Sequence, residues 1–113
     1  SESVQNPDDI LSLTAMIGYV QKHYPAKILL KDIAAAGNCC KTKCTALFQN
    51  YLSTSPMLYL NHYRLEKGSQ LLCTTTLFIT EIAFACGFSG ASYFCKLFHR
   101  QYHMTPKEYR KRG

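Results

Sequence analysis

The stretch that decides the fold is "EIAFACGFSGASYFCKLFHRQYHMTPKEYR", residues 81–110. It predicts a short helix ended by Gly87, a tight turn, a longer helix over 91–102 and another helix that begins at Thr105-Pro106. A thinner version, "DIAAAGNCCKTKCTALFQNYLSTSPMLYL", occupies residues 32–60, and the later copy has one extra residue between its first two helices. Short helix, turn and longer helix form the helix-turn-helix plan, whose second helix can enter a DNA major groove. A plain helical hairpin shares this plan, so the repeat is what favours the helix-turn-helix.

The rest of the chain also predicts helices. Residues 8–24 show an apolar face made by Ile10, Leu13, Ile17 and Val20. A helix over 56–72 begins after Ser55 and connects the two copies; Gly68 inside it is expected to weaken it mildly. We therefore expect an all-α fold of two helix-turn-helix subdomains, or homeodomain-like lobes. The predicted division is a first lobe over 1–54, a connecting helix over 55–73 and a second lobe over 74–113, acting as one DNA-binding unit.

Charge is spread unevenly along the 113 residues, whose net charge is +6. Residues 1–37 hold three lysines against four acidic residues, a net charge of −1, whereas residues 38–113 hold ten basic residues against three acidic ones, a net charge of +7. A basic body predicts a polyanionic partner such as duplex DNA, with solubility alone as the alternative. No apolar run approaches the roughly 20 residues that span a bilayer. We expect a soluble, cytoplasmic chain without a membrane partner, and one that begins like a fragment of something longer.

Six cysteines occur, three of them close together at Cys39, Cys40 and Cys44. No histidine follows at zinc-finger spacing, so buried free thiols in a reducing compartment are favoured over a metal site, and no cofactor is expected. A thiol- or metal-responsive module using these three cysteines remains an alternative. The sequence shows no Ser-His-Asp set, no glycine-rich phosphate loop and no paired carboxylates on a helix. We therefore expect no enzyme, and a protein-interaction domain without DNA binding is the other alternative.

Residues 81–110 resemble, almost position by position, the second motif of the AraC/XylS family of bacterial transcription regulators, and "SPMLYLNHYRLEKGSQLL", residues 55–72, is similar to the family's connecting helix. The resemblance covers residues 10–110. Departures are Leu29 and Phe78 where Ser or Thr often caps a short helix, Gly68 for a usual Ala, and Cys40 and Cys44 for a usual Ser and Leu.

The resemblance implies sequence-specific binding of double-stranded DNA and regulation of transcription, as an activator that touches RNA polymerase. It also implies a ligand-sensing or dimerisation domain ahead of Ser1. A small-molecule effector would act only through that domain. Two linked but different recognition helices are expected to occupy successive major-groove faces, about 34 Å apart, on an asymmetric site. A connecting helix too short to follow straight DNA would favour bending of that DNA.

Helical periodicity separates the two faces of each recognition helix. Phe94, Leu97 and Phe98 share one face of the second helix, and Cys44, Leu47, Phe48 and Tyr51 share one face of the first. By resemblance, the base-reading positions are Thr42, Thr45, Ala46, Ser92, Tyr93 and Lys96. The candidates for contact with the DNA backbone are Lys41, Lys43, Gln49, His99, Arg100, Lys107 and Arg110. Arg64 is expected to be either a structural residue or a DNA contact.

Overall fold

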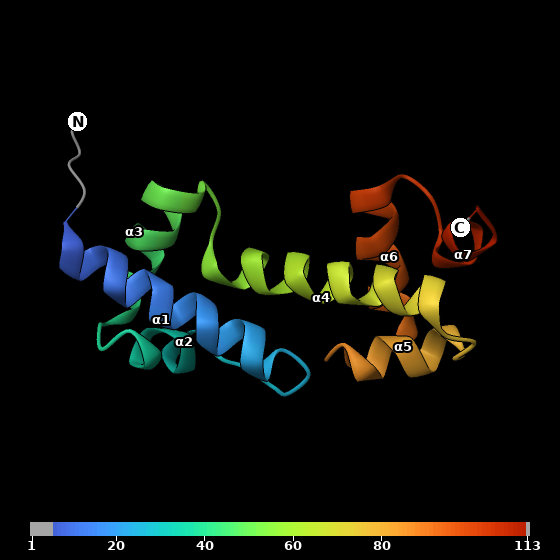
Figure 1. Cartoon of the computed structure of the whole chain (residues 1–113), viewed down its shortest axis with the longest axis horizontal. Helices are drawn as coiled ribbons and strands as arrows, with labels where there is room; N and C mark the ends of the chain where they lie inside the picture. Colours follow the sequence, from blue (N-terminus) through green and yellow to red (C-terminus); the bar gives the residue numbers. More distant parts are fainter. Residues whose placement is uncertain (1–5, 113) are drawn as a thin grey trace. The chain divides into compact units, whose positions relative to one another are not determined.

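The computed structural model describes residues 6–112, and these fold into seven helices without a strand (Figure 1). The predicted all-α fold is thereby confirmed. The helices are α1 (Pro7–His23), α2 (Leu30–Ala36), α3 (Lys41–Leu52), α4 (Pro56–Thr74), α5 (Ile79–Ala85), α6 (Ala91–Tyr102) and α7 (Pro106–Arg112).

The chain divides into two compact units, Ser1–Leu60 and Asn61–Gly113, with the boundary inside α4. The predicted division into a first lobe, a connecting helix and a second lobe remains a prediction about function. Residues 1–5 and 113 of those predicted lobes lie outside the described residues. Within the described part of the chain, no helix is both long and apolar enough to cross a bilayer.

The first unit packs α1, α2 and α3 around one core. Leu13, Met16 and Val20 are the buried residues of α1, and Ile17 packs against the core, so the predicted apolar face is confirmed at three of its four positions. The prediction was wrong at Ile10, which is 40% exposed, and it left out Met16. The buried face is rotated towards Met16 because Gly37 leaves room there: a Cβ at Gly37 would lie 2.7 Å from Met16 Cγ. Close approach of the two helices therefore sets which side of α1 is buried.

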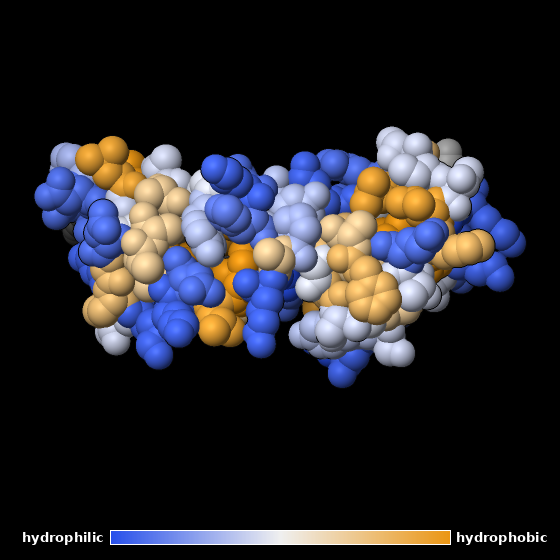
Figure 2. All heavy atoms as spheres, turned by 90° about the horizontal axis from the view of Figure 1, so that it is seen from below, coloured by the Kyte–Doolittle hydropathy of each residue, from blue (hydrophilic) through white to orange (hydrophobic). Residues whose placement is uncertain are grey.

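The second unit packs α5, α6 and the later part of α4 around an aromatic core. Phe98 lies at its centre, with ring centroids 5.6 Å from Phe94, 4.5 Å from Tyr102 and 5.3 Å from Tyr109. Tyr109 belongs to α7, so this short helix is held to α6 by ring contacts. The exposed apolar side chains outside the core include Phe78 and Phe84, and Figure 2 shows orange apolar surface scattered among blue polar surface.

Both helix-turn-helix turns have the same backbone hydrogen bond and a residue in the left-handed conformation. The amide of Cys39 donates to the carbonyl of Ala34 at 3.1 Å, and the amide of Phe88 donates to the carbonyl of Ala83 at 2.9 Å. Between them lies one left-handed residue, Asn38 (φ 56°) in the first copy and Gly87 (φ 97°) in the second. Each bond closes the end of a short helix and turns the chain into the recognition helix. The extra residue of the second copy falls after this turn, as the sequence predicted.

The short helices α2 and α5 begin at Leu29 and Phe78, which offer no side-chain cap, as expected. Their backbone amides are nevertheless satisfied, because Leu29 N–H donates to the carboxylate of Asp32 at 2.8 Å and Phe78 N–H donates to Glu81 at 2.8 Å. Each helix start therefore has one of the two hydrogen bonds of a capping box, the one from the N-cap amide to the N3 carboxylate. At α4 the predicted cap is confirmed, since Leu58 N–H donates to Ser55 Oγ at 3.2 Å.

Gly68 has a packing role that the sequence did not reveal. A Cβ at this position would lie 2.8 Å from the ring of Phe94, which is fully buried. The expectation that Gly68 merely weakens its helix was therefore incomplete, because its missing side chain lets Phe94 of α6 pack directly on α4. Arg64, on the same helix, is only 8% exposed and its guanidinium lies 6.0 Å from the ring of Phe88. Burial lowers the pKa of Arg64, and this environment favours the structural role for it.

We expect Gly68→Ala to destabilise the domain although alanine is the better helix former. Alanine gains up to about 1 kcal/mol of helix propensity, but forcing a methyl against a buried ring costs about 1–3 kcal/mol. Gly18→Ala is the matched control, since a Cβ there meets nothing within 4 Å. Chemical denaturation should show opposite signs for the two variants; a stabilised Gly68→Ala protein would mean that Phe94 can move aside.

We expect Phe98→Ser to unfold or strongly destabilise the second unit, because removing a buried phenylalanine costs about 3–5 kcal/mol even for alanine. Phe84→Ser is the control on the same unit, as Phe84 is 56% exposed. Thermal melting of both variants tests the assignment, and equal melting temperatures would contradict it.

Candidate nucleic-acid interface

The first recognition helix, α3, has a clear division between its faces. Cys44, Leu47 and Phe48 are buried, which confirms the predicted inner face, and Tyr51 is half-buried beside them. The opposite face carries the sequence-predicted contact residues, all of them exposed: Thr42, Thr45, Ala46 and Gln49. The structure therefore brings these four side chains together on one surface, where a ligand can reach them.

The second recognition helix, α6, has the same division with longer outer side chains. Phe94 and Phe98 are fully buried, while Leu97 is half-buried. Tyr93 is 49% exposed, and its ring meets the edge of Phe88 at 6.1 Å, so the core fixes its orientation. The remaining predicted contact residues on this helix are all exposed: Ser92, Lys96, His99 and Arg100.

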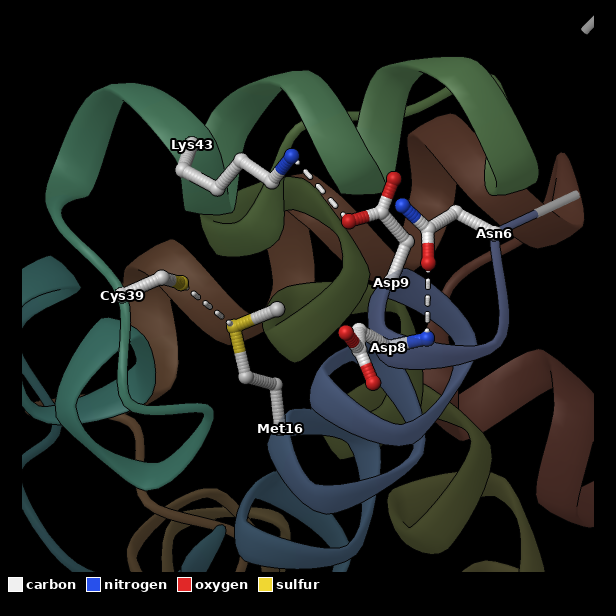
Figure 3. A network of polar contacts seen from close by, with 6 residues as sticks. All are labelled: Asn6, Asp8, Asp9, Met16, Cys39 and Lys43. Carbon is white, nitrogen blue, oxygen red and sulfur yellow. Dashed lines mark hydrogen bonds and ion pairs between the residues drawn. The ribbon is translucent and has the colours of Figure 1, made fainter.

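The predicted phosphate contacts fall into two kinds. Both Lys41, the first residue of α3, and Lys107, the second residue of α7, are exposed. Lys43 is instead engaged within the first unit: its Nζ lies 3.0 Å from Oδ1 of Asp9, as Figure 3 shows between α3 and α1. Because the Lys43 side chain is still 50% exposed, a DNA phosphate can compete with Asp9 for it.

Arg110 differs from the other candidates. Its Nε donates to the carbonyl of Leu72 at 3.1 Å and its guanidinium also donates to the carbonyl of Thr75 at 3.2 Å. Leu72 lies in the last turn of α4, where orphan acceptors need donors, and Thr75 follows the helix directly. The geometry favours a structural role for Arg110 over the predicted contact with the DNA backbone.

The thiols near α3 do not form a common site. Cys44 is buried, and desolvation, followed by the neighbouring Cys39, raises its pKa to about 11. Burial also raises the pKa of Cys39, whose Sγ lies 3.9 Å from Met16 Sδ (Figure 3). Cys40 is exposed at the start of α3, where the backbone amides of Lys43 and Thr42 lower its pKa. Among residues 6–112, no three histidine, cysteine or acidic side chains are grouped so as to hold a metal ion.

Comparison with known proteins assigns the family. A family model described as a helix-turn-helix domain matches residues 33–112. The HTH-type transcriptional regulator YdeC of Bacillus subtilis is 35% identical over 96 residues, which are 85% of this chain and 33% of that protein. An AraC-type transcriptional regulator structure from Chromobacterium violaceum superposes with a TM-score of 0.86 at 29% identity, covering 94% of this chain and 95% of that one. The chain belongs to the AraC/XylS family of helix-turn-helix DNA-binding domains.

Other relatives agree with this assignment. MtrA of Neisseria gonorrhoeae, also an HTH-type transcriptional regulator, is 38% identical over 84 residues, covering 74% of this chain and 28% of that protein. The DNA-binding domain of AdpA, solved in complex with a target DNA, shares the fold with a TM-score of 0.84 at 22% identity, over 88% of this chain and 90% of that one. The resemblance inferred from residues 55–72 and 81–110 is confirmed, and the family it names is one of transcription regulators rather than enzymes. This AraC-type domain spans about a third of the length of the curated relatives it matches.

One feature of the interface was missed by sequence reasoning. The pairing of Asp9 with Lys43 joins residues 34 positions apart, and helical periodicity carries no signal for it. Asp8 and Asp9 lie in the first turn of α1, where negative charge interacts favourably with the helix dipole.

We expect Asp9→Asn to raise DNA affinity, because it releases Lys43 and removes a negative charge beside it. An exposed ion pair is worth about 0.2–1 kcal/mol, so affinity should rise about 1.4- to 5-fold. The dependence of binding on salt should steepen by about one phosphate contact.

Asp8→Asn is the control for that measurement. It makes the same charge change in the same helical turn, and no ion pair with Lys43 joins that position. Fluorescence anisotropy against labelled duplex DNA over a salt series measures both variants. A loss of affinity in Asp9→Asn would mean that Asp9 holds Lys43 in its binding position.

Proposed function

We propose that this AraC-type domain binds duplex DNA sequence-specifically through α3 and α6, and that the protein to which it belongs regulates bacterial transcription. The observation that carries the proposal is the repeated pair of recognition helices, each with a buried apolar face and an exposed polar one. Residues 38–113 add a net charge of +7, which favours a polyanion. Relatives such as YdeC and MtrA are named as transcriptional regulators, which supports the same function.

The two recognition helices occupy successive major-groove faces of one site in this proposal. Their outer surfaces differ, so the site is asymmetric in sequence rather than palindromic. The residues that contact bases are those predicted by resemblance: Thr42, Thr45, Ala46, Ser92, Tyr93 and Lys96. The residues that contact the backbone are Lys41, Lys43, Gln49, His99, Arg100 and Lys107.

The proposed setting follows from the family. The protein acts in the cytoplasm as an activator that touches RNA polymerase, and any small-molecule effector acts through a separate N-terminal domain. The thiol- or metal-responsive alternative is not favoured, because two of its three cysteines are buried or half-buried with raised pKa values. A measurement of binding to duplex DNA distinguishes the proposed function from the other alternative, an interaction module without DNA binding.

Selection of bound sites from a random duplex pool tests the proposed function. We expect a single asymmetric motif with two conserved segments about one helical turn apart, and affinity that falls steeply with salt. An interaction module without DNA binding would enrich no motif. Competition with unrelated duplex DNA at fixed salt then measures the ratio of specific to non-specific affinity.

We expect Lys96→Ala to weaken the selected site more than random DNA. Lys96 is exposed on the outer face of α6, where a well-placed base contact provides about 1–3 kcal/mol of discrimination. Lys107→Ala is the control, since it removes the same charge from a predicted backbone contact and should weaken both DNAs by the same factor. Equal losses for Lys96→Ala would show that Lys96 contacts a phosphate.

A further inference from the structure

A groove of about 630 Å3 runs along the outer face of α3 within the first unit. Leu30, from the first turn of α2, lines it together with Thr42, Thr45 and Ala46 of α3. Lys41 borders it at the start of α3, while Gln49 and Asn50 border it two turns later. The part of the groove between these borders therefore lies against short side chains.

The chemistry of this central part is mainly apolar. Leu30 and Ala46 have no polar side-chain atoms, and each threonine presents a methyl group beside its hydroxyl. None of the four can form the bidentate hydrogen bonds by which Arg, Lys, Asn or Gln identify guanine or adenine. Leu30 is half-buried and packs against the core of the first unit, so its exposed methyl groups have a fixed position.

The major-groove edge of DNA offers one apolar group that distinguishes bases, the C5-methyl of thymine. We propose that the groove over α3 receives thymine C5-methyl groups, and that Leu30 determines specificity from outside the recognition helix. This inference rests on the proposed DNA binding and adds the chemical feature of the base that the first lobe recognises. Lys41 next to the groove supplies a cation for the adjoining phosphate, and its place at the border leaves the apolar centre to the base edge.

The second lobe differs at the decisive position. With the one-residue insertion counted, α3 and α6 align at a spacing of 50 residues, so that Phe48 corresponds to Phe98 and Ala46 to Lys96. A long cation thus stands on α6 where α3 has a methyl group. The preference for thymine methyl groups is accordingly assigned to the half-site under the first lobe, and hydrogen bonding to bases to the half-site under the second.

Parallel selections from two random duplex pools test this inference, one pool synthesised with thymidine and the other with deoxyuridine in its place. Uracil pairs as thymine does but lacks the C5-methyl, so only methyl recognition is removed. In the thymidine pool we expect thymines to be enriched in the half-site that does not respond to Lys96→Ala. In the deoxyuridine pool that enrichment should disappear, while the half-site that responds to Lys96→Ala is still selected.

Direct titration then measures the effect on the selected site. Replacing one thymine of the first half-site by uracil should weaken binding about fourfold, the factor expected for burying one methyl-sized apolar group. The double variant Thr42→Ser, Thr45→Ser keeps both hydroxyls and removes both protein methyl groups from exposed positions. It should show a smaller difference in affinity between thymine and uracil sites than the unchanged protein does, and Leu30→Ala, checked by its melting curve, should also narrow that difference.

The outcomes separate this inference from the proposed function. Identical motifs from the two pools, or an unchanged thymine-to-uracil ratio in the double serine variant, would overturn methyl recognition while leaving DNA binding intact. Enrichment of no motif from either pool would overturn the proposed function and this inference with it. Loss of selection at the Lys96-dependent half-site in the deoxyuridine pool would overturn the assignment of methyl recognition to the first lobe.

Discussion

Burial of one aromatic-bearing face on each recognition helix is the interaction on which the rest of the structure depends. Phe48 in the first unit and Phe98 in the second are both fully buried, and each fixes the rotation of its helix about the helix axis. Once that rotation is set, periodicity alone turns the residues on the other side outward. The backbone turns at Ala34–Cys39 and Ala83–Phe88 set the direction in which each recognition helix leaves its short helix. The buried phenylalanines set the rotation of each recognition helix about its own axis.

Most of this arrangement could be predicted from the sequence because it rests on local signals. Periodicity, a Ser-Pro start, a Thr-Pro start and the glycines after the short helices predicted all seven helices, with the end of α4 at Thr74 instead of Leu72. The buried faces of α3 and α6 were predicted as well, since their apolar residues recur at three and four positions and leave few alternatives. The identities of the residues that contact DNA remain predictions.

The errors came from contacts between elements. In α1, apolar side chains at six positions allow more than one buried face, and the choice of Met16 over Ile10 depends on the close approach of α1 to Gly37. Gly37 follows the short helix α2, as predicted, but its φ is −97° and the left-handed residue of this turn is Asn38. Gly68 likewise serves a neighbour, Phe94. Arg110 remains a predicted phosphate contact, although its hydrogen bonds to the carbonyls of Leu72 and Thr75, for which the sequence carries no signal, favour a structural role.

The two lobes also show why one chain can read two different half-sites. The inner positions of the repeat are similar, as in Ile33 with Ile82 and Phe48 with Phe98, because each lobe must bury a core before it can present a helix. The outer positions do not have to form a core, and there Ala46 of α3 corresponds to Lys96 of α6. Exposed substitutions of this kind usually change stability by less than about 0.5 kcal/mol, so the outer surfaces are free to diverge.

One inner position of the repeat carries residues of different size in the two lobes. Cys44 corresponds to Phe94, and the larger ring of Phe94 is accommodated by the missing side chain of Gly68. A change of volume in a packed core needs a compensating change nearby, because interiors leave few voids to absorb it. Inner positions of the repeat can therefore differ only in matched pairs, whereas outer positions differ singly. This difference in coupling lets a duplicated helix-turn-helix keep its fold while its two DNA-facing surfaces become chemically distinct.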